Sequence, residues 1–410
     1  MGSNEKTTVF QSREGEIFRI PALYYNNNEK KLFAFAEKRT TADDATSVAL
    51  VMSNYVKQLL NFNTILWSLP EEVVKKCSCG YRPMNPCAVY EKHTQTLFLF
   101  FIYVIGTEGF QIDNHWNKAR LWYVTKKSDN KWSEVTEVTD VLPEMKHWST
   151  FAIGPGHGIQ TESGRMIVPA YAYTGPENEK AAPHAFCFYS DDYGKTWRCS
   201  KMLSEASIEC QVAEIYDSKG HSLIYCNARS QGGYRVQAEI DDRGFHAITP
   251  VTPLVETGGG CEGSVISFPA QSGEPNTKWL LFCHPTNPKE RLDLGVYRNN
   301  SPLNSNENCS GAWSKPWVIN KGPSGYSDLA YIEDGWFACL MERGEKTYTE
   351  EIVFCTLFLM FTVPNWFSSK LHAGLVIASK NDFLLVTPDV WSAHPVHQFL
   401  HLTCRSLMLL

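Results

Sequence analysis

The sequence predicts an all-β protein with the architecture of a β-propeller. The segment Ser190–Trp197 carries the S-x-D-x-G-x-T-W pattern of an Asp-box hairpin, a turn that marks one blade of such a fold. Short β-rich runs recur along the whole chain between Gly, Pro, Asn and Asp. Degenerate copies of the turn at 128–132 and 241–245 are spaced from the Asp-box by about 50 to 65 residues, the length of one four-stranded blade.

The Asp-box is expected to be a structural turn, with a separate task for each of its conspicuous residues. Asp192 can accept hydrogen bonds from the backbone that follows it, and Gly194 can adopt a positive φ. Trp197 opens the outgoing strand, where its indole can pack across the hairpin. None of these residues is expected to take part in catalysis.

Apolar runs predict the strands in chain order, at 31–36, 96–102, 165–170 and 279–283. Helical periodicity is weak throughout, and Leu69–Lys76 is the best short helix candidate. The longest apolar run, Ile352–Val363, is shorter than the roughly 20 residues of a membrane-spanning helix. We therefore expect a buried strand pair in that run.

Composition and charge exclude several classes of function. The balance of 38 basic against 44 acidic side chains gives a net charge of −6, which excludes a broad basic surface for nucleic acid. The polar N-terminus lacks the apolar stretch of a secretory signal, and 13 cysteines without a framework spacing are expected to be thiols in a reducing compartment. Gly154–Gly158 lacks the strand–GxGxxG–helix context of a phosphate site, so turn geometry explains it. We expect neither a cofactor nor a metal ion.

Three arginines are the first candidates for a binding site. Arg19 lies inside an apolar strand run, Arg229 ends the run 223–226, and Arg291 precedes a strand. A guanidinium in an apolar run is costly unless its charge meets an anion or a carboxylate. Each of them taken singly is more often a structural ion pair, so composition alone leaves both interpretations open.

Several motifs extend the evidence beyond these arginines. They are Arg19-Ile20-Pro21, Ala36–Arg39, Arg82–Cys87, Gly154–Gly158, Val168–Tyr173, Glu209–Glu214, Gly263–Phe268 and Gly325–Leu329. On these motifs the chain resembles the animal exo-α-sialidases from about Val9 to Phe354, and in particular their plasma-membrane members that act on gangliosides, with the cytosolic members close behind. The resemblance implies a six-bladed propeller of four-stranded antiparallel blades. It places a catalytic domain at 1–362 and leaves an atypical C-terminal tail at 363–410, and against the family pattern Cys355–Phe358 is an insertion between Phe354 and Leu359.

The resemblance assigns four arginines to the substrate. Arg19, Arg229 and Arg291 would grip the carboxylate of a sialic acid, for which planar, permanently charged guanidiniums are well suited. Arg39 would lie near the amide and O4 side of the sugar.

The resemblance also assigns three catalytic residues. Tyr326 would be the nucleophile and Glu209 the base that takes its proton. A neutral phenol suits this substrate because an anionic nucleophile would be repelled by the carboxylate on the anomeric carbon. Asp44, in the polar loop 40–44, would be the general acid, with Asp43 as the neighbouring alternative.

The remaining assignments concern the wall of the pocket. Met84, Asn85, Tyr171 and Tyr173 match positions around the N-acetyl and glycerol groups, although ordinary core packing would otherwise explain such a Met and such aromatics. Glu108 lies in a loop that matches a substrate loop loosely.

The resulting function is hydrolysis of terminal α-linked sialic acids from gangliosides, oligosaccharides and glycoproteins. Two alternatives stay open: a propeller that binds sialoglycans without turnover, and transfer of the sialic acid to another sugar. The expected location is the plasma membrane through peripheral contact, or the cytoplasm.

Overall fold

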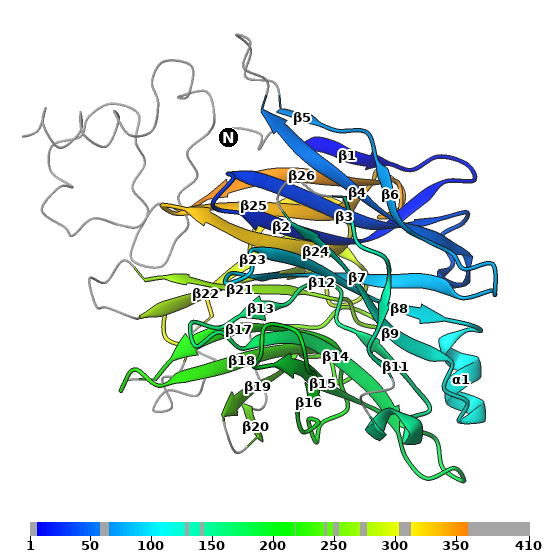
Figure 1. Ribbon diagram of the computed structural model, residues 1–410. Coiled ribbons are helices and arrows are strands. Elements are labelled where there is room, and N and C mark those ends of the chain that lie inside the picture. The colour runs from blue at the N-terminus through cyan, green and yellow to red at the C-terminus, as the bar shows by residue number, and fades with distance from the viewer. Residues whose placement is uncertain are drawn as a thin grey trace, which may run out of the picture.

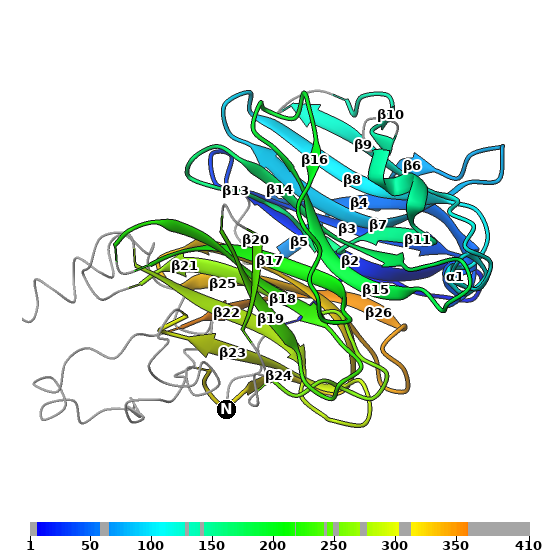
Figure 2. The same ribbon diagram turned by 90° about the horizontal axis from the view of Figure 1, so that it is seen from below.

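The computed structural model describes residues 6–57, 65–127, 131–139, 143–217, 219–241, 244–248, 254–270, 277–302 and 313–359. This part of the chain is built almost entirely of antiparallel strands in five sheets (Figures 1 and 2). The degenerate turn copies at 128–132 and 241–245 and the tail at 363–410 lie partly or wholly outside the described residues.

The first three sheets hold the N-terminal half. The first contains β2 (Ile17–Asn26), β3 (Lys31–Arg39), β4 (Ser47–Lys57), β5 (Ile65–Trp67) and β6 (Glu71–Lys75). The second contains β7 (Arg82–Glu91), β8 (Thr96–Val104), β9 (Ala119–Lys127), β10 (Thr136–Glu137) and β12 (Gly156–His157), which runs parallel to β7. The third contains β11 (Thr150–Ile153), β13 (Ile159–Gln160), β14 (Met166–Thr174), β15 (Ala182–Ser190) and β16 (Arg198–Cys199).

The other two sheets hold the C-terminal half together with the first strand. The fourth sheet contains β17 (Ile208–Tyr216), β18 (Ser222–Arg229), β19 (Val236–Asp241) and β20 (Gly244–Ile248). The fifth contains β21 (Ser264–Pro269), β22 (Lys278–Pro285), β23 (Leu292–Asn299), β24 (Trp317–Glu333), β25 (Trp336–Arg343), β26 (Glu351–Phe358) and β1 (Thr7–Gln11). The prediction of a uniform four strands per sheet therefore fits only one of the five sheets, because short extra strands and the long β24 enlarge the others.

Helical segments are few among the described residues. They are the helix α1 (Glu108–Asn114) and the 3-10 turns η1 (Asp44–Thr46) and η3 (Pro143–His147). In both overall views α1 lies at the edge of the molecule (Figures 1 and 2). No described helix is long and apolar enough to cross a lipid bilayer.

Apolar clusters between neighbouring sheets form the core. Phe35 of the first sheet packs with Leu99 of the second, and Phe100 of the second packs with Phe151 of the third. Further clusters join the third sheet to the fourth and the fourth to the fifth. Leu23 of the first sheet shares a cluster with strands of the fifth. The packing therefore returns from the last sheet to the first.

The two ends of the described chain meet in the fifth sheet. Thr7 of β1 pairs with Phe354 of β26, and Figure 1 shows the blue β1 close to the orange β26. The residues Cys355–Phe358, which seemed inserted, continue β26 in register with β25 up to Trp336. The apolar run at 352–363 thus forms one buried strand over its described part rather than the expected strand pair, and 360–363 lies outside the described residues.

The turn at Ser190–Trp197 connects β15 to β16. The Asp192 carboxylate accepts hydrogen bonds from the Thr196 backbone N–H (2.8 Å) and hydroxyl (2.7 Å), and Gly194 has a φ of 85°. The Trp197 indole is buried against Phe100, with ring centroids 4.8 Å apart. These contacts fasten the hairpin to the neighbouring sheet, as expected for a structural turn.

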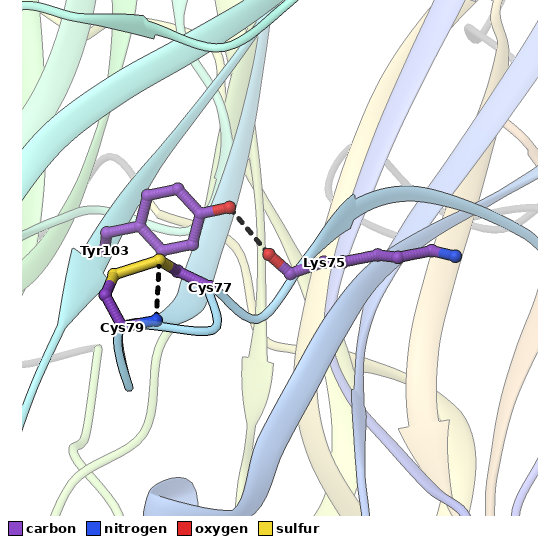
Figure 3. The surroundings of a disulfide bond; sticks show 4 residues. All are labelled: Lys75, Cys77, Cys79 and Tyr103. Atoms are coloured by element: carbon purple, nitrogen blue, oxygen red, sulfur yellow. Dashed lines mark hydrogen bonds between the residues drawn. A yellow bond between two sulfur atoms is a disulfide. The ribbon is translucent and has the colours of Figure 1, made fainter.

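Two local expectations were wrong. The predicted helix Leu69–Lys76 is mainly the strand β6, because Val74 pairs with Leu50 of β4 and buries its side chain in the core. Cys77 and Cys79 form a disulfide instead of carrying free thiols. Figure 3 shows this disulfide beside Tyr103, whose hydroxyl donates a hydrogen bond to the Lys75 carbonyl (2.6 Å).

Candidate functional site

One cavity of about 570 Å³ brings together every site residue that the sequence predicts. Its lining includes Arg19, Arg39, Asp44, Met84, Asn85, Glu108, Tyr171, Tyr173, Glu209, Arg229, Arg291 and Tyr326. These residues come from all five sheets, some near the start of a strand, as Arg19 in β2, and others at the end of one, as Arg39 in β3 and Arg229 in β18. Such convergence of distant segments on one small volume is what a binding or catalytic site requires.

Three guanidinium groups surround the Tyr326 side chain. The Arg19 and Arg291 guanidinium carbons lie 5.6 Å and 5.2 Å from the centre of the Tyr326 ring. Arg229 Nη1 donates a hydrogen bond to the Tyr326 hydroxyl at 3.2 Å. The cluster concentrates positive charge at one wall of the cavity, so this wall favours an anionic ligand.

Each of these guanidinium groups is held by acceptors of its own. Arg19 Nε donates to Glu342 Oε1 at 2.6 Å, and Arg229 Nη1 donates to Glu209 Oε2 at 2.8 Å. Arg291 Nη2 donates to a backbone carbonyl, that of Gly260, at 2.9 Å. Fixed acceptors leave the guanidinium groups oriented before a ligand arrives, which lowers the entropy cost of binding.

Tyr326 and Glu209, which both line the cavity, form a direct pair. The Tyr326 hydroxyl donates a short hydrogen bond to Glu209 Oε1, and both residues are buried. Burial raises the pKa of the Tyr326 phenol well above 10, and the Glu209 carboxylate adds to this effect. Arg229 and Arg291 lower that pKa but do not outweigh burial. In the free site burial therefore keeps the Tyr326 phenol neutral, with its proton in the hydrogen bond to Glu209.

Asp44 lies at the rim of the cavity. Its carboxylate forms an ion pair with Arg39, and its side chain is 69% exposed whereas that of Arg39 is fully buried. Arg39 also pairs with the buried Glu37 carboxylate, with 2.6 Å between Nη2 and Oε2. Because Glu37 stays with Arg39, Asp44 can turn toward a ligand without leaving a buried charge unpaired.

The remaining candidates in the cavity lining are Met84, Asn85, Glu108, Tyr171 and Tyr173. Asn85 donates from its backbone N–H to Glu37 Oε1 (2.7 Å) and from its side chain to the Ile153 carbonyl (2.9 Å). The Tyr171 hydroxyl donates to Glu108 Oε1 at 3.0 Å, and Glu108 opens the first turn of α1. Met84 and Tyr173 also line the cavity, so these residues offer apolar surface beside a few hydrogen-bonding groups.

Three residues of the cavity lining have an unusual backbone conformation. Ile20, Asn85 and Glu209 have positive φ values of 59°, 57° and 40°. Each lies where the register of its strand shifts, in β2, β7 and β17 respectively. Positive φ is strained for a residue with a side chain, and such bulges redirect side chains at the ends of strands beside functional sites.

Several residues around the cavity are not among those predicted from the sequence. Arg82, Thr150 and Gln231 line it, and Arg82 Nε donates to the Asp44 carbonyl at 3.0 Å. Tyr348 contacts two of the arginines, since the Arg19 and Arg291 guanidinium carbons lie 5.1 Å and 5.3 Å from its ring centre. Arg82 opens the motif Arg82–Cys87, and its charge beside apolar residues could have marked it as a site residue. No local sequence pattern marks Tyr348 in this way.

The fold and cavity define an all-β protein of the BNR repeat type with an arginine-rich pocket around a tyrosine–glutamate pair. The BNR repeat-like domain family matches residues 30–339. Sialidase-3 of Rattus norvegicus is 39% identical over 400 residues, which cover 85% of this chain and 93% of that protein. Sialidase-2 of Cricetulus griseus is 40% identical over 388 residues, covering 90% and 98% respectively. The chain therefore belongs to the sialidase family of glycoside hydrolases.

A solved structure gives the same picture at the level of the fold. A Hadza microbial sialidase aligns with a TM-score of 0.68 and 20% sequence identity, covering 84% of this chain and 66% of its own.

Proposed function

We propose that this chain is a retaining exo-α-sialidase with Tyr326 as its nucleophile. The observation that carries the proposal is the direct hydrogen bond from Tyr326 to Glu209 inside a ring of three guanidinium groups. A protein that only binds an anionic sugar needs the guanidinium groups, but it has no need for a buried phenol joined to a base.

The first half of the reaction forms a glycosyl–enzyme bond. Arg19, Arg229 and Arg291 bind the carboxylate of the sialic acid and bring its anomeric carbon toward Tyr326. The phenol oxygen bonds to that carbon while its proton passes to Glu209, and the bond to the leaving oxygen breaks. Asp44 gives its proton to the leaving oxygen, which departs as an alcohol.

The second half restores the enzyme. Asp44, now a carboxylate, takes a proton from a water molecule whose oxygen attacks the anomeric carbon. The bond from this carbon to Tyr326 breaks, and the phenol regains its proton from Glu209. Two displacements at one carbon return its original configuration, so the sialic acid leaves as the α anomer.

We infer six blades for the fold. The strand β24 is 17 residues long, with its first part paired to β23 up to Pro323 and its second part paired to β25 from Ser324 onward. Division at this point turns the seven-stranded sheet into two four-stranded units. In the last unit β1 is the outer strand, so the N-terminus closes the ring.

The proposed substrates are sialylated glycolipids and glycoproteins, which the enzyme reaches in the cytoplasm or through peripheral contact with the plasma membrane. Similarity to both sialidase-3 and sialidase-2 supports this range of substrates. Rates on a ganglioside in vesicles and on a soluble sialoside of the same linkage, combined with membrane fractionation, would separate the two locations.

The stereochemistry of the first product tests the proposal. Proton NMR of the full chain acting on an α-linked sialoside should detect the α anomer of sialic acid before it converts to the β anomer. The β anomer as first product would contradict a Tyr326 intermediate, and binding without release would favour the sialoglycan-binding alternative. With lactose added, sialyl-lactose as the main product would favour the transferase alternative.

The pH dependence of substrate binding should depend on Glu108. Desolvation raises the pKa of this carboxyl to about 7, and the nearby Glu209 and Asp44 carboxylates add to the effect. Below pH 7 Glu108 is therefore mostly neutral, and above it the carboxylate repels an anionic substrate. We expect KM to rise by about threefold to tenfold between pH 6 and pH 8, and the rise to disappear in Glu108→Gln. Glu177→Gln, a change at an exposed loop position, is the control and should keep the wild-type profile.

A further inference from the structure

A buried carboxyl group that the mechanism above does not use lies behind the nucleophile. Glu262 precedes β21, and it is only 1% exposed to solvent. It does not line the cavity, so its task differs from that of Glu209.

Glu262 contacts the backbone next to Tyr326. Its Oε2 accepts a hydrogen bond from the Ser327 N–H at 3.1 Å. On the other side, Glu342 Oε2 accepts from the Tyr326 N–H at 3.0 Å. Two buried carboxyl groups therefore hold consecutive N–H groups of β24, and this fixes the backbone from which the phenol projects.

The remaining carboxyl oxygens of Glu262 and Glu342 differ in their hydrogen bonds. Glu262 Oε1 has no hydrogen-bond partner among the residues that the structure describes. The Glu342 carboxylate, by contrast, accepts from the Arg19 guanidinium and thus has a cation at hydrogen-bond distance. An ionised carboxylate with an unpartnered buried oxygen is costly, and a proton on that oxygen removes most of the cost.

The charged groups around Glu262 also favour its neutral form. Burial raises its pKa well above 4.5, and the Asp328 and Glu209 carboxylates raise it further. The Ser327 N–H and Arg235 lower that pKa, but Arg235 is already bonded to Glu256 at 3.0 Å and to the Cys261 carbonyl at 2.6 Å. The surroundings of Glu262 from β17 and β24 are therefore mainly negative.

We propose that Glu262 is a positioning residue that works as a neutral carboxylic acid, holding the Tyr326–Ser327 backbone in place for attack. This inference rests on the proposed function of Tyr326. In the neutral form Glu262 keeps its hydrogen bond to Ser327 and leaves Glu209 as the negative partner of the phenol. Ionisation would place a further negative charge beside Asp328 and Glu209, and their repulsion would displace the segment that carries the nucleophile.

Two variants test the role of the proton. Glu262→Gln copies the shape of the neutral acid, so kcat near pH 5.5 should stay within about threefold of wild type, and the alkaline limb of kcat should move up by about one pH unit. Glu262→Ala removes the contact, so kcat should fall by about tenfold or more with KM within about threefold. Glu214→Gln, at a buried carboxyl on β17 that pairs with Lys278 away from the cavity, is the control and should keep the wild-type pH profile of kcat.

The outcomes separate this inference from the function on which it rests. A Glu262→Gln enzyme with kcat as low as that of Glu262→Ala, or with an unmoved alkaline limb, would overturn the role of the neutral acid. If Glu262→Ala does not fold, the pH profile of Glu262→Gln decides by itself. A wild-type chain that releases no sialic acid would refute the proposed function and this inference together, whereas wild-type turnover with unchanged profiles would refute the inference alone.

Discussion

Replacing Tyr326 with phenylalanine is expected to lower kcat on a fluorogenic sialoside by about a thousandfold, with binding of a sialic acid analogue within about threefold of wild type. The change removes the phenol oxygen that we propose as the nucleophile, together with its hydrogen bond to Glu209, but keeps the ring that packs beside Arg19 and Arg291. Because the guanidinium groups keep their other acceptors, the site for the carboxylate should persist. The reaction should then be limited by direct attack of water.

The appropriate control is another buried tyrosine. Tyr297 is 3% exposed in a core cluster of the fourth and fifth sheets, and Tyr297→Phe should leave kcat within about twofold of wild type. Turnover by Tyr326→Phe at more than a tenth of the wild-type rate would exclude Tyr326 as the nucleophile. Equal loss of turnover and of analogue binding would instead indicate that the phenol supports the shape of the site.

The residues predicted for the site belong to short motifs that can be read from the sequence. Arg19, Glu209 and Tyr326 stand in such motifs, and the cavity brings them together. The positive φ values at Ile20 and Glu209 could not be foreseen, since a β-branched or charged residue gives no local sign of such a conformation. The bulges persist because the packing of whole sheets holds the backbone in these strained conformations. Such packing depends on residues far apart in the sequence, so no short motif reveals it.

The incorrect predictions have the same origin. The short-range pattern of Leu69–Lys76 predicts a helix, whereas pairing with β4 and burial of Val74 make most of it a strand. Cys355–Phe358 seemed an insertion when compared with a family pattern. In the structure it extends β26 beside β25 by four residue pairs, from Cys339↔Cys355 to Trp336↔Phe358, and none of these residues lines the cavity.

Asp328 is the site of the largest expected loss of stability. This carboxylate is fully buried and accepts hydrogen bonds from the Leu23 N–H (2.7 Å) and the Ser264 hydroxyl (3.0 Å). It also pairs with His157 Nδ1 at 2.6 Å and accepts from Gln211 Nε2 at 3.3 Å. One side chain thus links β2, β12, β17 and β21 to β24.

Asp328→Ala should lower the free energy of unfolding by about 4 kcal/mol, because it leaves several buried donors without a partner. Urea unfolding of the full chain measures the loss. Asp217 offers a matched control, since it also pairs with a histidine, His221 at 2.9 Å, but at an exposed turn where water replaces the lost contacts. Asp217→Ala should therefore change the unfolding midpoint little. An Asp328→Ala chain as stable as Asp217→Ala would show that the sheets hold together without this link.

The ion pair between His157 and Asp328 should make the free energy of unfolding fall as pH rises. Burial alone would lower the pKa of His157, but the Asp328 carboxylate outweighs it and raises that pKa above the ordinary 6.5. The folded chain therefore binds this proton more tightly than the unfolded chain. The resulting stabilisation is fully present below pH 6.5 and is lost as pH rises through the folded-state pKa of His157. In Asp328→Asn the charge that raises the pKa is gone, so this decline in unfolding free energy between pH 6 and pH 9 should be much smaller. A decline as steep as in the wild type would mean that another group carries it.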